Sequence, residues 1–157
     1  MKIIEKYINI IGKSISCLIP LMTLLMIVVI VSRYFFDSGR TDLQELVMYF
    51  HSLVFLGCAG YVFNQDEHVR VDIFYREAST KYKNIVDLVC GIIFLLPVSA
   101  VILYFSIDLV SMSWSIKESS TEPGGLAYVY IQKTFIYFFP ITLIGAFLYK
   151  VTRAIWK

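Results

Sequence analysis

The chain has 157 residues, of which 58 % are hydrophobic and 17 % are charged, and its formal net charge is +2 at pH 7. The apolar share is above and the charged share below the usual values, which excludes a disordered tail, a collagen and a coiled coil. The length suggests one domain, the weak charge without a basic–aromatic stretch argues against nucleic-acid binding, and three cysteines make no disulfide framework.

Four long runs without a charged residue dominate the sequence: 14–32, 46–65, 88–107 and 134–149. About 20 apolar residues in a helix cross a hydrocarbon core of about 30 Å, whereas barrel strands alternate over about 10 residues. We therefore predict an all-α integral membrane protein, a single membrane domain with four transmembrane helices. The expected spans are about 15–36, 43–64, 84–112 and 127–149.

Residues 1–13 place apolar side chains at helical spacing, with polar side chains between them. This pattern favours an amphipathic helix that lies in the membrane interface. The alternative is that the first membrane helix simply begins early.

The first apolar run has a basic start, as a secretory signal peptide has. It is longer than a signal-peptide core, however, and it ends in Ser-Arg-Tyr-Phe-Phe at 32–36 rather than in a small-residue cleavage site. We therefore expect an uncleaved anchor, kinked at Pro20.

Lysine and arginine are distributed unevenly between the two sides that these spans define. Ten lie on the side of the termini and four on the other side. Cytoplasmic loops carry the excess of basic residues, so we expect both termini to be cytoplasmic. The segments 37–42 and 114–125 would lie outside and 66–83 inside.

His51 is the ionisable side chain placed deepest in a predicted span, about seven residues or about 10 Å from the start of the span. The other histidine, His68, lies at the opposite face, and no carboxylate stands three or four residues from His51. A hydrogen-bonded histidine facing another helix is therefore favoured over a haem or metal ligand. We expect no cofactor or metal in this chain.

Three further charges lie near the outer ends of spans. Arg33 and Glu45 flank the short outer loop and either form an ion pair or are solvated separately. Lys133 is expected to extend its ammonium outward to the interface.

Small residues suggest close helix packing in the second span. The sequence Gly-Cys-Ala-Gly at 57–60 leaves a narrow face, which can meet another helix of this chain or a partner. Cys17, Cys58 and Cys90 are expected to be small packing residues.

The two longer loops carry local signals. Asp72 can cap a short amphipathic helix in the inner loop, and Thr80 can cap the third span. Pro-Gly-Gly at 123–125 is a turn signal in the outer loop.

Two stretches carry a family resemblance. The sequence ELVMYFHSLVFLG at 45–57, followed by DEHVRVDIFY at 66–75, resembles the small membrane subunit of the tripartite ATP-independent periplasmic (TRAP) transporters of bacteria and archaea. The outer segment at 118–126, together with Lys133, resembles one branch of that family.

The resemblance implies a transport role without enzymatic activity, in the bacterial cytoplasmic membrane. In such systems a soluble periplasmic binding protein captures an organic acid, a dicarboxylate or a sugar acid for example. A large multispanning subunit imports the acid, usually with sodium, while the small subunit braces the large one and helps to dock the binding protein. The near absence of ionisable groups at mid-membrane depth suits that role.

Two other classes stay open: a small self-assembling channel or carrier, and an accessory subunit of a membrane redox system or enzyme. A channel would need a polar stripe along one span, and a redox subunit would need paired ligands.

The candidate site residues fall into two sets. Candidate contacts with the large subunit or with lipid are Arg33, Glu45, His51, Gly57, Gly60, His68, Arg70, Asp72 and Lys133. Candidate contacts with the binding protein are Arg40, Lys117, Glu118, Glu122, Gly124 and Gly125.

Overall fold

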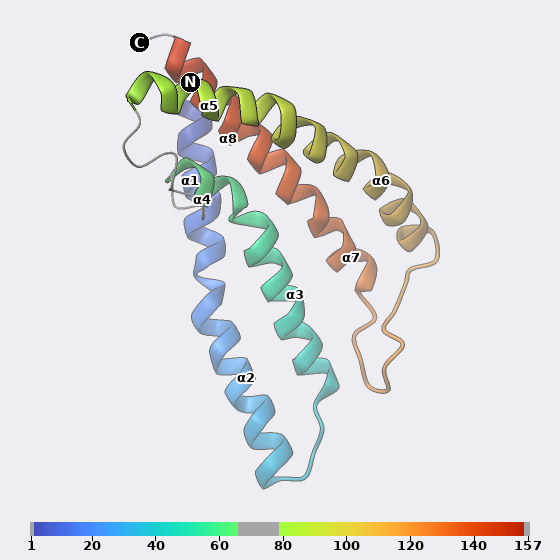
Figure 1. Ribbon diagram of the computed structural model, residues 1–157. Helices are drawn as coiled ribbons and strands as arrows, with labels where there is room; N and C mark the ends of the chain where they lie inside the picture. The colour runs from blue at the N-terminus through green and yellow to red at the C-terminus, as the bar shows by residue number, and fades with distance from the viewer. Residues whose placement is uncertain (1, 66–78, 156–157) are drawn as a thin grey trace.

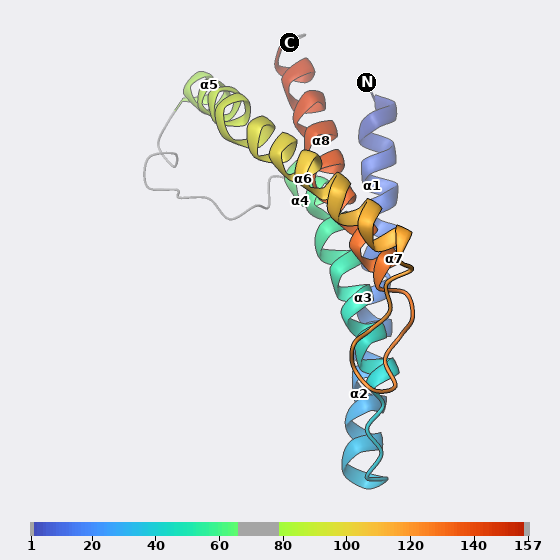
Figure 2. The same cartoon turned by 90° about the vertical axis from the view of Figure 1, so that its right-hand side faces the viewer.

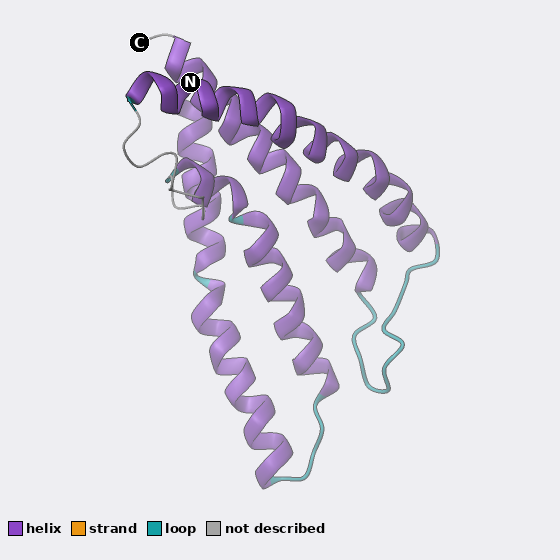
Figure 3. Ribbon diagram, in the orientation of Figure 1, coloured by secondary structure: helices purple, strands orange, loops and turns teal. Residues whose placement is uncertain are grey.

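The structure is a computed structural model of the chain, and it describes residues 2–65 and 79–155 (Figure 1). Every regular element in these ranges is a helix (Figure 3). Four helical segments are long and apolar enough to cross a membrane, which confirms the predicted fold class. They extend over Glu5–Phe35, Thr41–Asn64, Lys81–Ser115 and Val129–Thr152.

The first span consists of α1 (Lys2–Ser16) and α2 (Leu18–Phe35), which are separated only at Cys17. The break lies just before Pro20, whose ring nitrogen cannot donate to the carbonyl four residues earlier. The two helices continue in nearly the same direction in both views (Figures 1 and 2). The first membrane helix therefore begins early, as the second of the two interpretations expected.

The second span consists of α3 (Thr41–Gly57) and α4 (Ala59–Asn64). A methyl group on Gly60 would collide with the backbone carbonyl of Thr142, and one on Gly57 would lie 2.6 Å from Ile15 Cδ1. The Thr142 hydroxyl also accepts a hydrogen bond of 3.3 Å from the Gly60 amide. The narrow face at 57–60 is thus used inside this chain, against the first and fourth spans.

The cysteines differ in their surroundings. Cys58 is buried, and its thiol donates to the carbonyl of Gly12 at 3.6 Å. Cys17 and Cys90 are exposed, so these two do not pack in the interior of this chain.

The third span consists of α5 (Thr80–Cys90), a π-helical turn (Gly91–Leu95) and α6 (Leu96–Ser115). Its N-cap is Ser79, whose hydroxyl accepts from the amide of Tyr82 at 3.4 Å, so the expected cap at Thr80 lies one residue too far along the chain. The span has 35 residues and is about 52 Å long. Since a hydrocarbon core is about 30 Å thick, this span must cross at a tilt. In both views it runs obliquely past the other helices (Figures 1 and 2).

The fourth span consists of α7 (Val129–Thr134), a 3-10 turn (Phe135–Tyr137) and α8 (Phe138–Ile155). Helix α8 contacts α1, α3, α4 and α6 and is the centre of the fold. Its buried side chains include Leu143, Ala146 and Phe147.

Much of the apolar surface is exposed, and the exposure is uneven. Only 6 % of the most apolar window of the first span and 11 % of that of the third are buried, against 33 % and 28 % in the second and fourth. Helix α2 buries only Val29. The first and third spans therefore present apolar side chains to lipid or to another protein.

Both termini lie at one end of the molecule, together with the start of α5 (Figure 1). The loops 36–40 and 116–128 lie at the opposite end (Figure 1). The expected helix at Asp72 falls outside the described residues.

Candidate functional site

The outer loop is held down by a carboxylate at the start of the second span. Glu45 accepts hydrogen bonds from the Ser120 hydroxyl and from the backbone amide of Leu126, the latter at 2.6 Å. Both of its oxygens are thus occupied by the loop. Arg33 is exposed in the last turn of α2, and the hypothesis of an Arg33–Glu45 ion pair is wrong because the loop supplies the partners of Glu45.

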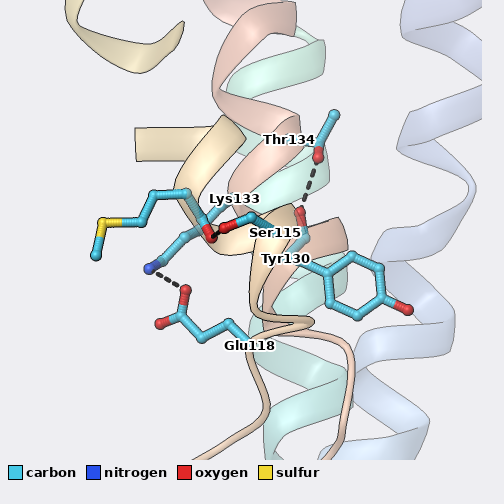
Figure 4. A network of polar contacts seen from close by, with 6 residues as sticks. Ser115, Glu118, Tyr130, Lys133 and Thr134 are labelled. Atoms are coloured by element: carbon cyan, nitrogen blue, oxygen red, sulfur yellow. Dashed lines mark hydrogen bonds and ion pairs between the residues drawn. The ribbon is translucent and has the colours of Figure 1, made fainter. Parts of the chain in front are cut away.

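Lys133 binds the same loop. Its ammonium lies 2.5 Å from a carboxylate oxygen of Glu118 (Figure 4). The hydrogen bond from Lys133 holds the pKa of Glu118 below its ordinary value of 4.5. The ammonium of Lys133 thus reaches an anionic partner in the outer loop.

Aromatic side chains close the gap between α6 and α7. Trp114 donates its indole N–H to the Thr134 hydroxyl at 2.9 Å. Thr134 donates in turn to the carbonyl of Tyr130 at 2.8 Å (Figure 4). The Lys117 ammonium lies 4.6 Å from the Trp114 ring centre and 5.0 Å from that of Tyr130, within the range of a cation–π contact.

These contacts form three groups, around Glu45, Lys133 and Trp114, which together we call the outer clasp. Its members are Glu45, Trp114, Lys117, Glu118, Ser120, Lys133 and Thr134. Trp114, Ser120 and Thr134 were not among the residues suggested by the sequence. Their partners are distant along the chain, as Ser120 is from Glu45 by 75 residues, and no local spacing indicates such a contact.

The outer clasp divides the residues that the sequence suggested for docking. Glu118 is half-buried in its ion pair with Lys133, and Gly125 packs against Ser120 and Glu45. Lys117 is exposed, although its ammonium lies over the Trp114 ring. The remaining candidates are exposed.

Besides Lys117, three candidates lie on the outer surface. Arg40 lies 2.8 Å from the Asp42 carboxylate in an exposed ion pair. Glu122 is exposed, and Gly124 has open space around it and a φ of 76°, a conformation that favours glycine in a turn.

At the inner end, side chains of α8 make polar contacts with α1, α4 and α5. Lys150 lies 2.9 Å from Asp87 of α5 and 5.4 Å from the ring centre of Phe63 in α4. The Tyr149 hydroxyl donates to Glu5 of α1. The candidates His68, Arg70 and Asp72 lie outside the described residues.

His51 lies on an exposed face of α3, where its ring stacks on Phe55 with a centroid separation of 6.4 Å. Within the described part of the chain it makes no hydrogen bond to another helix, so the expected hydrogen bond is wrong, although the ring faces α2 and α7. It lines an apolar groove of about 670 Å³ with Met22, Met26 and Gln132. Among the described residues no group of three or more His, Cys, Asp or Glu could hold a metal ion.

The comparisons with known proteins give one match. The family model described as "Tripartite ATP-independent periplasmic transporters, DctQ component" matches residues 22–155, from α2 to the end of α8. No curated protein and no solved structure matches the chain. The chain therefore belongs to the DctQ family, the small component of the TRAP transporters.

Proposed function

We propose that this small TRAP subunit braces a large multispanning subunit in a bacterial inner membrane and helps to dock a soluble periplasmic binding protein. The transported substrate in this proposal is an organic acid, and its import is coupled to sodium. The family match supports the association with both partners.

The exposure of the first and third spans carries the proposal. Their most apolar windows are 6 % and 11 % buried, although these two spans are the longest of the four. A chain that carried substrate by itself would enclose a path between its helices. This chain instead directs its apolar surface outward, as expected of a subunit that packs against a larger membrane partner.

The charges of the spans support the same role. Ion and proton carriers place ionisable groups near mid-membrane. In the described spans no carboxylate or ammonium group lies in the middle third. Glu45, Asp87 and Lys133 lie close to the ends, and Asp108 lies seven residues before the end of the third span. Coupling to sodium is therefore assigned to the large subunit.

The outer surface supports a docking role. The outer clasp holds the loop 116–128 against α3 and α7, so a partner would meet an ordered surface and lose little loop entropy on binding. Charges of both signs, from Arg40, Asp42 and Glu122, are exposed beside it. Such charges steer and orient a transient partner without strong attachment.

Reconstitution tests the bracing role. Liposomes that contain the chain alone, the large subunit alone or both together are given a sodium gradient, the binding protein and labelled organic acids. We expect uptake only when both subunits are present. Saturable uptake by this chain alone would overturn the proposal.

Charge reversal tests the docking role. In the intact complex, Arg40→Glu and Glu122→Lys should raise the concentration of binding protein that gives half-maximal uptake, and salt should affect the variants less than the wild type. Lys81→Glu, an exposed reversal at the inner end, is the matched control. Unchanged curves for both outer variants would show that these residues are not part of the docking surface.

A further inference from the structure

Asp108 lies on the side of α6 that faces away from the rest of the chain. The opposite side carries Ser99, Ser106 and Ser113, which are all buried. Asp108 is nine residues after Ser99, and at about 100° per residue it lies half a turn away from it. Its side chain is exposed, and α6 lies at the edge of the bundle (Figure 1).

Large apolar side chains surround Asp108 on this side of the helix. Tyr104 and Met112 are four residues away in either direction and are 71 % and 68 % exposed. Phe105 is 68 % exposed and meets the Tyr104 ring edge-on at 5.3 Å. We call Val101, Tyr104, Phe105, Asp108 and Met112 the Asp108 face.

The carboxylate of Asp108 has no partner among residues 2–65 and 79–155. It lies seven residues before the end of α6, about 10 Å along the helix. Trp114 and Lys117 are typical of the membrane interface and mark that end. An aspartate is too short to reach the interface in the way that lysine and arginine do.

An ionised carboxylate that faces acyl chains is costly, and membrane proteins pair such groups with a cation or enclose them. Lipid tails supply neither a cation nor a hydrogen-bond donor. A second copy of this chain, packed about a twofold axis on this face, would bring Asp108 against Asp108, and like charges repel. The remaining occupant is a different membrane protein with a basic group.

We infer that the Asp108 face contacts the large subunit and that an arginine or lysine on a membrane helix of that subunit pairs with Asp108. This inference rests on the proposed bracing function and names the surface that performs it. The aromatic and Met side chains around the carboxylate would exclude water from the pair and strengthen it.

Photo-crosslinking in the intact complex tests the contact without a change in charge. A photoreactive amino acid replaces Tyr104 or Met112 in the full-length chain, which is expressed with the large subunit. We expect adducts with the large subunit from both positions. Adducts with lipid only, or with a second copy of this chain, would overturn the inference.

Charge changes at Asp108 test the pairing. Asp108→Asn should lower the yield of co-purified large subunit by about tenfold, and Asp108→Arg should abolish the complex. A basic-to-acidic substitution in the large subunit, selected for restored growth on the substrate, should rescue Asp108→Arg. Asp37→Asn, which makes the same chemical change at an exposed position outside the membrane, is the matched control and should leave the yield unchanged.

The outcomes separate the inference from the proposed function. If the wild-type chain does not co-purify with the large subunit, the bracing function fails and the inference fails with it. If the wild-type complex forms and Asp108→Arg forms it equally well, with no adducts from positions 104 and 112, only the inference fails. The abundance and melting temperature of each variant in detergent identify a folding defect, and the crosslinks then decide.

Discussion

Glu45 connects parts of the chain that are 75 and 81 residues apart, through the Ser120 hydroxyl and the Leu126 amide. A hydrogen bond to a charged group contributes about 1.5–3 kcal/mol. Because this carboxylate binds the loop at Ser120 and Leu126, removing it should loosen the loop there while the spans stay intact.

We therefore expect Glu45→Ala to lower the free energy of unfolding by about 2 kcal/mol. Hydrogen exchange at the Leu126 amide should become faster, since that amide loses its acceptor. Glu122→Ala, which removes an exposed carboxylate of the same loop, is the control. Unchanged protection of the Leu126 amide in Glu45→Ala would contradict this account.

Glu118 should make stability depend on pH. The hydrogen bond from Lys133 lowers the pKa of Glu118 in the folded protein from its ordinary value of 4.5. The contribution of ionised Glu118 to folding stability is therefore complete above pH 4.5, and it is lost as the pH falls through the lowered pKa of the folded protein. Denaturation of wild type and Glu118→Gln in detergent should differ at neutral pH and converge in acid. A constant difference down to the lowest pH at which the protein folds would exclude this ion pair as the cause.

Helices α4 and α8 approach each other closely at Gly60. A methyl group at Gly60 would collide with the Thr142 carbonyl, which belongs to the backbone and cannot rotate away. We expect Gly60→Ala to destabilise the protein by about 1–3 kcal/mol. Gly39→Ala is the control, because nothing lies within 4 Å of the position that its methyl group would occupy. Equal melting temperatures for the two variants would mean that the helices separate without cost.

The spans could be predicted from the sequence because the absence of charge over 16 to 20 residues is a property of each segment alone. The predicted cap of the third span, Thr80, is one residue from the observed cap, Ser79. Serine and threonine are both good N-caps, so only the backbone conformation selects between them. The sequence could not decide whether residues 1–13 form an interfacial helix or the start of the first membrane helix. The amphipathic pattern of α1 is the same in both cases.

The outer clasp could not be predicted in the same way. The partners of Glu45 and Lys133 depend on where the loop 116–128 folds back, and that follows from the positions of three helices. The hydrogen bond expected of His51 could not be judged from the sequence for a related reason. The sequence places His51 in a span but does not indicate which side of α3 packs against the other helices.

The placement of both termini at one end bears on the orientation of the whole molecule (Figure 1). The basic residues gather on that side of the spans, so the termini should be cytoplasmic. A phosphatase fused at Lys157 should be inactive in cells, whereas the same enzyme inserted at Gly124 should be active. A fusion active at Lys157 would reverse the orientation and place the outer clasp in the cytoplasm.

The π-helical turn at Gly91–Leu95 changes how the third span should be aligned with the third span of a relative. Gly91 and Ser99 are both buried, although residues eight apart in a regular α-helix point about 80° away from each other. The π-helical turn contains one extra residue, which compensates for this rotation. Gly91, which packs against Phe147, and Ser99 therefore face the same side of the span. In an alignment with a relative whose third span is a regular α-helix, the one-residue gap therefore belongs inside 91–95. A gap placed at either loop would shift the segment between that loop and the π-helical turn by one residue, so that its inward positions are matched to positions about 100° around the other helix.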